Sequence, residues 1–259
     1  MSIYNFVAEI FYKLIVFRNY IFCKFFVHQI KDYKQIPIII NNRNRYSFLL
    51  QLLKKLEEDG YSNIHILDNK STYPLLLEYY KITPHKVYFL EKNYGFKALE
   101  LSGLITKFNK NYFVYTDPDV VPIKECPSNY LELFYKTLQK YPTVQKVGFS
   151  LKIDDLPDHF DKKNDVIEWE SSLYGSKLND ILYLAPIDTT FALHRPLARI
   201  STQGRYKNIR TGFPYEALHL PWYNDSKNLS EEEKYYINSA EIGTHWTTGV
   251  GEKNIPFYK

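Results

Sequence analysis

Apolar and polar positions follow each other along the first half of the chain in an order that predicts strands and helices in turn. Short apolar runs, typical of buried strands, occupy residues 36–40, 63–68, 86–90 and 111–116. Between them, apolar residues recur at helical spacing over 49–60, 73–81 and 96–108. Strands that alternate with helices form mainly parallel sheets through right-handed crossovers. The pattern therefore predicts an α/β fold with a Rossmann-like, mainly parallel central sheet flanked by helices.

The second half of the chain has a less regular pattern. It predicts a helix over 128–141, a strand over 146–153, a helical stretch around Trp169, a strand over 189–193 and then a loop-rich remainder. No repeat, low-complexity stretch or linker interrupts this part of the sequence. We therefore expect one continuous domain over residues 35–259, preceded by a separate helical segment, residues 1–34.

Residues 1–34 carry an aromatic-rich pattern of their own. Apolar residues recur there at helical spacing: Ile3, Val7, Ile10, Leu14, Phe17, Ile21 and Phe25. Glu9, Lys13, Arg18 and Lys24 interrupt the run, whereas a membrane-spanning helix needs about 20 mostly apolar residues. A small-residue cleavage site, as in a signal peptide, is also missing. The segment predicts an amphipathic helix that lies in a membrane interface, or one that packs on the domain or on a partner chain.

Composition and charge narrow the classes of function. The chain has 259 residues, of which 45% are hydrophobic, so it can bury a sizeable core. Its formal net charge is +4, with 33 basic and 29 acidic residues, and this balance argues against nucleic acid as a partner. Cys23 and Cys126 form no motif, which argues against a disulfide framework or a zinc cluster. We expect a cytoplasmic protein, either free or peripheral on the inner face of the membrane.

Two carboxylates follow the strand predicted at 111–116. Asp117 and Asp119 are separated by one proline, and Pro122 then ends the apolar run. In an open α/β sheet, ligands bind at the carboxyl ends of the strands. Paired carboxylates there suit a hard divalent cation that shares its ligands with phosphates. The pattern predicts a Mg²⁺ or Mn²⁺ site at Asp117 and Asp119, and the alternative is a solvated turn.

The motifs at the predicted strand ends resemble those of a GT-A-fold glycosyltransferase of the family 2 type. They are Asn42-Arg43, Asp68-Asn69-Lys70-Ser71-Thr72, Asn93-Tyr94-Gly95 and Asp117-Pro118-Asp119. The resemblance covers most of residues 36 to 250. It implies a GT-A fold, a nucleotide-sugar donor, a glycan or lipid-linked acceptor, and Mn²⁺ or Mg²⁺ as cofactor.

The resemblance also implies roles for individual residues. Asn42, Arg43, Asp68 and Asn93 would contact the nucleotide sugar. Asp119 would bind the metal on the diphosphate, and Asp117 would contact the ribose, or the metal through water. The alternatives are an Asx turn or helix cap for Asp68 and a surface position for Arg43, whose guanidinium could otherwise pair with a phosphate or stack on a base.

The catalytic base is less clear from the sequence. The Glu-Asp pair that many family 2 enzymes carry on a late helix has no counterpart here, since Glu231-Glu232-Glu233 is typical of a solvated helix start. Asp155 follows a predicted strand and precedes Leu-Pro, which restricts the backbone. We expect Asp155 to be the base in an inverting mechanism, with Asp188 as second candidate. The alternative for Asp155 is a helix N-cap.

Aromatic residues and two histidines complete the candidate site. Trp169 and Glu170 could line the acceptor site, because aromatic faces suit sugar rings, although Trp169 could equally be a core residue. Trp222 is a further candidate for the acceptor site and lies in a proline-stiffened aromatic loop that begins with His219. Either His245 or His219 is expected as a further metal ligand.

These features together predict a metal-dependent glycosyltransferase, a hexosyltransferase-type enzyme of surface polysaccharide synthesis. One alternative is a nucleotidyltransferase, but residues 41–45 lack the Gly-rich loop that such an enzyme normally shows. The other is an inactive GT-A domain that binds glycan. The sequence leaves the donor sugar, the linkage and the choice between inversion and retention open.

Overall fold

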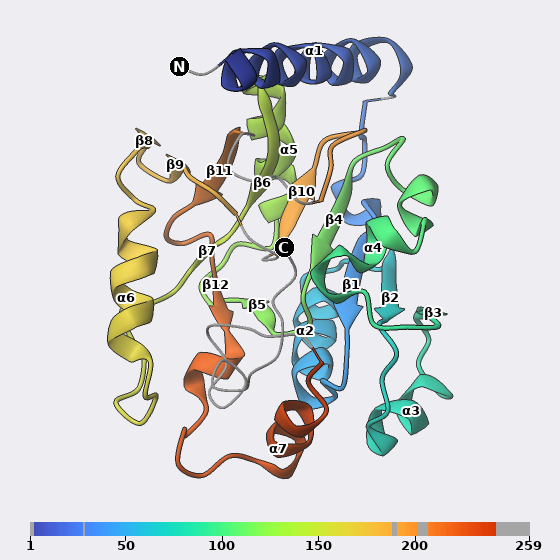
Figure 1. Cartoon of the computed structure of the whole chain (residues 1–259), viewed down its shortest axis with the longest axis vertical. Coiled ribbons are helices and arrows are strands. Elements are labelled where there is room, and N and C mark those ends of the chain that lie inside the picture. Colours follow the sequence, from blue (N-terminus) through green and yellow to red (C-terminus); the bar gives the residue numbers. More distant parts are fainter. Residues whose placement is uncertain (1–2, 28, 188–190, 201–206, 242–259) are drawn as a thin grey trace.

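The computed structural model describes residues 3–27, 29–187, 191–200 and 207–241. In this part of the chain a central sheet stands between helices (Figure 1). The α-helices are α1 (Ile3–Phe26), α2 (Ser47–Glu58), α3 (Pro74–Tyr80), α4 (Ala98–Leu101), α5 (Tyr130–Lys140), α6 (Lys163–Ser172) and α7 (Glu231–Asn238). Short 3₁₀ helices are η1 (Tyr33–Gln35), η2 (Gly95–Lys97), η3 (Leu104–Lys107) and η4 (Leu220–Tyr223).

The large sheet is mainly parallel, as predicted. Its nine strands lie in the order β3 (Lys86–Phe89), β2 (Ile64–Asp68), β1 (Ile38–Asn42), β4 (Phe113–Thr116), β10 (Ala192–His194), β6 (Val144–Gly148), β11 (Lys207–Thr211), β9 (Leu182–Leu184) and β8 (Lys177–Asn179). Only β9 and β10 of this sheet run against the other strands. A small sheet adds β5 (Val120–Pro122), β12 (Glu216–His219) and β7 (Ser150–Leu151) in the order β5-β12-β7.

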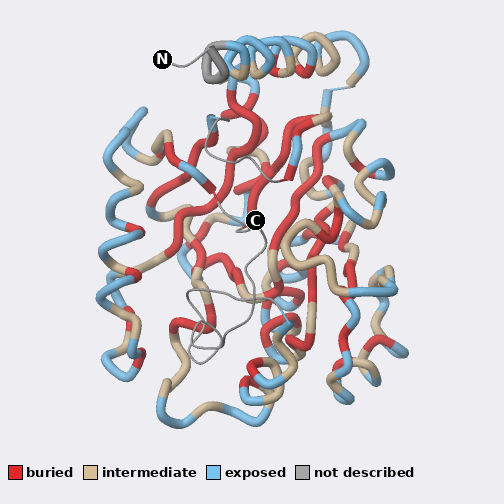
Figure 2. The backbone as a smooth tube through the Cα atoms, viewed as in Figure 1, coloured by how far each residue is buried: buried red, intermediate tan, exposed pale blue. Residues whose placement is uncertain are grey.

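The core lies on both faces of the large sheet (Figure 2). On one face, Ile38 and Ile40 of β1 pack with the leucines that α2 presents at i, i+3, i+4 and i+7 spacing. On the other face, Ile39 packs with Ala98 and Leu99 of α4. Burying one such aliphatic side chain contributes about 1.5–3 kcal/mol. The predicted alternation of strand and helix is thus confirmed by packing on both faces.

The strand predicted at 146–153 divides into two strands in different sheets. β6 ends at Gly148 and β7 begins at Ser150. A Cβ atom at Gly148 would lie 2.5 Å from the carbonyl oxygen of Phe191, so only glycine allows β6 and β10 to approach this closely. Past this point the chain leaves the large sheet and joins the small one.

Two further expectations about secondary structure were wrong. The helix predicted over 96–108 is three short pieces, η2, α4 and η3, and Gly103 separates the last two with a φ of +76°. The remainder predicted as loop-rich contains β11 and β12 instead, which are central strands of their sheets. Their polar residues, such as Arg210 and His219, obscure the strand pattern in the sequence.

Helix α1 lies across the end of the molecule opposite to the carboxyl ends of β1 and β2 (Figure 1). Its inner face is fixed by Val16, which is buried, and by the Asn19 amide, which donates to Gln145 Oε1 at 2.9 Å. Its outer face exposes large apolar residues: Val7, Ile10, Phe11, Leu14, Phe17, Phe25 and Phe26. Among the described helices, none is long and apolar enough to cross a membrane.

Candidate functional site

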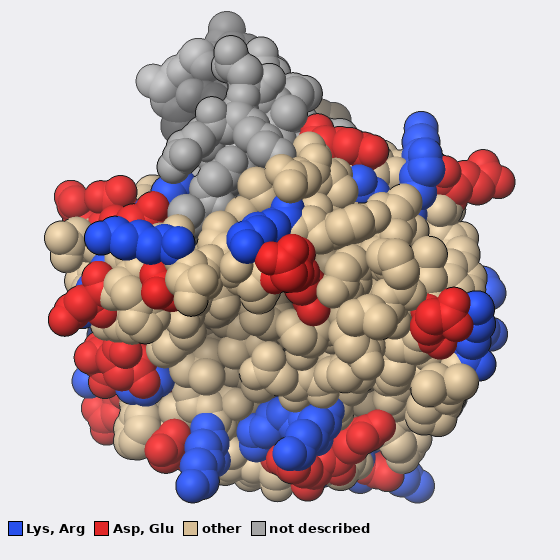
Figure 3. Space-filling model, turned by 90° about the horizontal axis from the view of Figure 1, so that it is seen from below, with Lys and Arg blue, Asp and Glu red and all other residues tan. Residues whose placement is uncertain are grey.

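The carboxyl ends of β1, β2 and β4 meet at one end of the sheet. Asn42 at the end of β1 is in register with Asp68 at the end of β2, and Ile40 is in register with Thr116, the residue before Asp117. Helix α7 lies at the same end (Figure 1). Figure 3 looks onto this end, where acidic and basic side chains are interspersed on the described surface. The strand-end motifs predicted from the sequence are therefore neighbours in space.

A histidine from a distant part of the chain lies beside Asp119. The antiparallel pairing of β5 with β12 places His219 opposite Val120, and Leu220 N donates to Asp119 O at 2.9 Å. His219 Nε2 is 3.9 Å from Asp119 Oδ2. Asp119 Oδ1 is buried and accepts no hydrogen bond from the residues that the structure describes.

This pair fits a divalent cation. A carboxylate oxygen and an imidazole nitrogen are both ligands of Mn²⁺, and their separation is short enough for one ion to bridge them. The described residues contain no group of three or more His, Cys, Asp or Glu side chains around such a point. A cation here would need phosphate or water oxygens to complete its shell. His245, the alternative ligand, lies outside the described residues.

Helix α7 attaches to the site through a buried ion pair. Arg45, in the loop after β1, pairs with Glu233, and both side chains are almost fully buried. Burial alone would lower the pKa of Arg45, but the nearby Glu233, Tyr236 and Asp119 raise it. The guanidinium carbon also lies 3.5 Å from the centre of the Tyr236 ring, a cation–π contact. Arg45 is therefore a fixed positive charge next to the carboxylates of the site.

The solvated helix start expected at Glu231-Glu232-Glu233 is wrong for two of the three residues. Glu233 is inside the protein with Arg45. Glu232 Oε1 accepts hydrogen bonds from Tyr46 N at 2.7 Å and Ser47 N at 3.0 Å, and so caps the N-terminus of α2. The acidic run begins α7 as expected, but it also binds the helix to the loop after β1.

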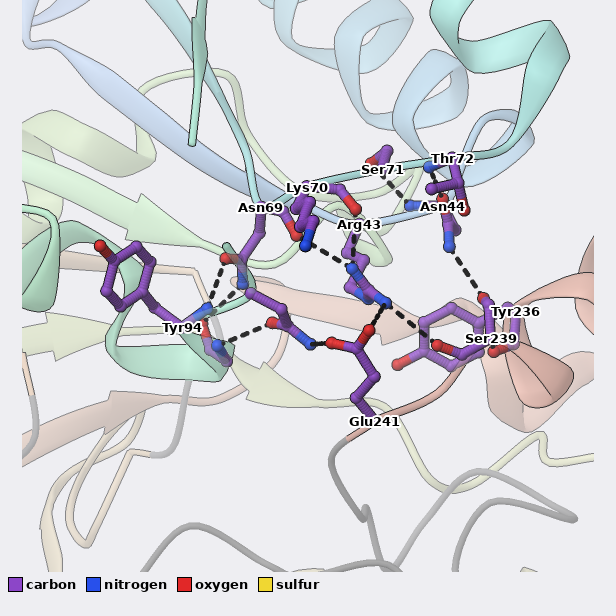
Figure 4. Close-up of polar contacts among 12 residues, drawn as sticks. Arg43, Asn44, Asn69, Lys70, Ser71, Thr72, Tyr94, Tyr236, Ser239 and Glu241 are labelled. Atoms are coloured by element: carbon purple, nitrogen blue, oxygen red, sulfur yellow. Dashed lines mark hydrogen bonds and ion pairs between the residues drawn. The ribbon is translucent and has the colours of Figure 1, made fainter. Parts of the chain in front are cut away.

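Arg43 joins three segments of the chain (Figure 4). Its Nη1 donates to Lys70 O at 2.7 Å and to Asn69 O at 3.3 Å, and its Nη2 donates to Ser239 O at 3.0 Å. The side chain is 14% exposed, so it is no ordinary surface arginine. It holds the turn after β2 and the segment after α7 against the end of β1.

Asn42 and Asp68 point into the protein. Asn42 Nδ2 donates to the Tyr80 hydroxyl at 2.8 Å. Asp68 is 2% exposed and accepts a hydrogen bond from Ser71 N at 3.1 Å, which is an Asx-type turn. Burial raises the pKa of the Asp68 carboxyl. These two residues shape the turns at the strand ends, and their predicted contact with a nucleotide stays a prediction.

Two asparagines of the site, Asn44 and Asn69, were given no individual role from the sequence. Asn44 has a positive φ of 54°, and its Oδ1 accepts from Thr72 N at 2.7 Å and from Tyr73 N at 3.0 Å. Asn69 Oδ1 accepts from Tyr94 N at 2.8 Å, which ties the loop containing Asn93 to the end of β2 (Figure 4). The run Asn41-Asn42-Arg43-Asn44 was the available signal, because asparagine tolerates left-handed turns.

Asp155 contacts Tyr223, the last residue of η4. It is exposed, and its Oδ1 accepts a hydrogen bond from the Tyr223 hydroxyl at 2.7 Å. Lys152 Nζ lies 3.4 Å from its Oδ2. Tyr223 ends the short segment that begins beside Asp119 at His219, so this segment connects the two carboxylates. Asp188, the second candidate for the base, lies outside the described residues.

The predicted acceptor residues have different environments. Trp169 is 55% exposed on α6, at the margin of the molecule (Figure 1). Its neighbour Glu170 is buried and pairs with Arg210 Nη1 at 2.8 Å. Trp222 is buried, and its ring lies 4.6 Å from that of His219. Among these three, Trp169 is largely exposed, whereas Glu170 and Trp222 are buried.

Glu216 is a further carboxylate that the sequence did not single out. It is the first residue of β12. It accepts hydrogen bonds from the Tyr174 hydroxyl and from Ser150 Oγ, each at 3.4 Å. Burial, and then the charge of Asp154, raise the pKa of Glu216. No motif in the sequence marks it, because its neighbours come from separate elements.

Comparison with known proteins gives similarities in structure alone. No protein-family model matches the chain, and no curated protein matches it. Among solved structures, it is similar to Staphylococcus aureus TarS 1-349, with a TM-score of 0.44, 12% identity, and coverage of 80% of this chain and 66% of that one. It is also similar to glucosyl-3-phosphoglycerate synthase from Mycobacterium tuberculosis, with a TM-score of 0.40, 14% identity, and coverage of 65% and 63%.

A third similar structure is GalNAc-T7 with UDP, GalNAc and Mn²⁺, with a TM-score of 0.40, 12% identity, and coverage of 71% of this chain and 43% of that one. The chain thus spans less than two thirds of each of these neighbours. The predicted α/β fold is confirmed by the structure itself. The TM-scores are below 0.5, so these similarities carry no argument about the family or the activity of this chain.

Proposed function

We propose that this chain is a glycosyltransferase that moves a sugar from a nucleotide diphosphate to a hydroxyl of a glycan or lipid-linked acceptor, in surface polysaccharide synthesis. The observation that carries the proposal is the approach of His219 to Asp119 at the carboxyl ends of the strands. That end of an α/β sheet is where nucleotide ligands bind.

Asp119 and His219 would hold Mn²⁺ or Mg²⁺, with Asp117 on the ribose or on the metal through water. The bound cation would neutralise charge on the diphosphate leaving group.

Arg43 and Asn93, both partly buried, would supply hydrogen-bond donors for the nucleotide. Asn42 and Asp68 would act indirectly. Their buried hydrogen bonds would hold the turns after β1 and β2, which the nucleotide would meet. Asn93 also shapes its own loop, since its Oδ1 accepts from Gly95 N at 2.9 Å.

Asp155 is the proposed proton acceptor for the acceptor hydroxyl, with Asp188 second. A carboxylate in this role must be exposed to the acceptor and held firmly. Asp155 meets both conditions, because it is exposed and Tyr223 donates a hydrogen bond to it. Trp169 would offer its open face to a sugar ring, and Glu170 and Trp222 would stabilise the surrounding surface from inside.

A thermal-shift assay with UDP, GDP, CDP and TDP, each with and without Mn²⁺, tests the proposal. Ligands that bind the folded state raise the melting temperature, so one nucleotide with Mn²⁺ should raise it by more than the separate effects combined. Asp119→Asn should remove this synergy. Asp180→Asn is the matched control, because Asp180 has a fully exposed side chain in the β8–β9 turn. If Asp119→Asn retained full metal-dependent turnover, the metal site would be assigned wrongly.

The outer face of α1 supports a peripheral contact with an anionic membrane surface. Phe11 and Phe17 are each 62% exposed there. Lys13 and Lys24 are exposed on the same helix, which suits the phosphates of lipid headgroups. We propose that the helix lies in the interface on the inner face of the membrane.

A further inference from the structure

Glu241 lies between the two residues proposed to meet the nucleotide (Figure 4). Its Oε1 is 3.3 Å from Arg43 Nη2. Its Oε2 accepts a hydrogen bond from Asn93 Nδ2 at 3.2 Å. One carboxylate therefore bridges the turn after β1 and the loop after β3, although it belongs to the segment that follows α7.

The partners of Arg43 show why this carboxylate is special. Three of them are neutral backbone carbonyls, those of Asn69, Lys70 and Ser239. Glu241 is the partner in this set that carries a negative charge. The Glu241 side chain is 59% exposed, whereas that of Arg43 is 14% exposed. The guanidinium thus has three backbone partners and one charged, largely exposed partner.

We infer that Glu241 occupies a subsite for an acceptor oxygen of the donor nucleotide, and that the bound nucleotide displaces it. The inference rests on the proposed function. Arg43 and Asn93 both donate hydrogen bonds, so the ligand group they fit is an anion or a carbonyl. A phosphate oxygen matches the charge of Glu241, and we assign the subsite to the diphosphate. A carbonyl of the base is the other source of such an oxygen.

Displacement is possible because the internal contact is weak. An ion pair this exposed adds little to stability. A protein that must first break an internal contact binds its ligand less tightly. Its apparent Kd equals the Kd of the open form divided by the fraction of molecules that are open. Removing the charge of Glu241 should therefore tighten nucleotide binding by about two- to fivefold.

Calorimetric titration of the full chain with Glu241→Gln tests the inference. The probes are UDP, GDP, CDP and TDP with Mn²⁺, and the four corresponding nucleosides. Glu231→Gln is the matched control, because Glu231 is an exposed glutamate of α7 that pairs with Lys234. Glu241→Gln should lower the Kd of the diphosphate that binds, and Glu231→Gln should leave it unchanged. A gain confined to the diphosphate assigns the subsite to phosphate, and an equal gain with the nucleoside assigns it to a base carbonyl.

An unchanged or raised Kd in Glu241→Gln would overturn the inference while leaving the proposed function intact. If neither the wild type nor the variant bound any of the four nucleotides, the proposed function would fail and the inference with it. Hydrogen exchange gives a second readout. Saturating nucleotide should speed exchange at residues 239–241 of the wild type, and slower exchange there would show that the nucleotide recruits Glu241 instead.

Discussion

At the carboxyl ends of β1, β2 and β4, charged side chains lie inside the protein, whereas on α1, at the opposite end, large apolar side chains lie outside. Arg45 and Glu233 are both almost fully buried. Phe25 and Phe26 are exposed. Figure 2 shows that the strands are largely buried and that much of α1 is exposed. Each region reverses the usual rule for soluble proteins.

The two reversals differ in what the chain itself supplies. Arg45 finds its counter-ion in Glu233, 188 residues away, so the fold already satisfies the buried charge. The apolar face of α1 has no such cover among the described residues, and an apolar surface of this kind marks an interaction site. The first region therefore balances its charge within the fold, whereas the second leaves an apolar face exposed among the described residues.

The largest effect should come from breaking the buried ion pair. Arg45→Met leaves the Glu233 carboxylate buried and unpaired, which costs about 3–5 kcal/mol in unfolding free energy. Urea unfolding measures it. Lys234→Met removes the exposed pair with Glu231 and should cost at most about 1 kcal/mol.

The double variant Arg45→Met/Glu233→Met should recover most of the loss, because no charge is then left buried. A loss below 1 kcal/mol in Arg45→Met alone would mean that the site end depends little on this pair.

The next effect concerns the proposed base. Asp155→Asn keeps the hydrogen bond from Tyr223 but removes the charge that accepts a proton, so turnover should fall by about 10²-fold or more. Nucleotide affinity should stay within about twofold. Steady-state kinetics and the thermal-shift assay separate the two. Normal turnover in Asp155→Asn with a collapse in Asp188→Asn would move the base to Asp188.

The same two regions show what the sequence could predict. The leucines of α2 and the outer residues of α1 recur at helical spacing, and that spacing is local information. The strand-end motifs around Asp68 and Asp119 were also recognisable, since each follows an apolar run. For these elements one stretch of sequence contains both the element and its reason, and the prediction agrees with the structure.

The contacts that complete the site are not local. The sequence left His219 and His245 as equal candidates, and the pairing of β5 with β12 is what brings His219 to Asp119. Strand β11 was missed because Arg210 looks like a surface residue until Glu170 is placed beside it. Glu233 was misjudged for the same reason, since its partner Arg45 precedes it by almost the whole domain.

A smaller effect should appear with pH, through a histidine buried uncharged at the α1 end of the sheet. His194 stacks on Phe113, with ring centres 5.0 Å apart. Burial, and then the charge of Lys146, hold the pKa of His194 well below 6.5. The unfolded chain therefore binds a proton that the folded chain does not, and stability present above pH 6.5 is lost as the pH falls below it.

The contribution of His194 to that loss should reach about 1.4 kcal/mol per pH unit. His194→Phe keeps an aromatic ring on Phe113 and removes the titration. The free energy of unfolding in urea is measured between about pH 7.5 and 5, a range that includes the pKa of histidine in the unfolded chain. It should depend less steeply on pH in the variant than in the wild type. Parallel curves for the two proteins would mean that His194 is not buried in its neutral form.

The smallest effect on folding should come from the outer face of α1, and it decides whether that face serves attachment. Phe11→Ser/Phe17→Ser changes two exposed residues, so the free energy of unfolding should move by less than about 0.5 kcal/mol. Sedimentation with anionic liposomes should nevertheless show at least tenfold weaker binding, because each phenyl ring that enters an interface contributes about 1.5–3 kcal/mol.

Val16→Ser is the matched control. Val16 faces the domain and is buried, so this variant should lose stability and keep its liposome binding. The double variant could instead fail to fold, or lose self-association without any change in liposome binding. Either result would mean that α1 is a packing element and that its exposed face does not attach the protein to a membrane.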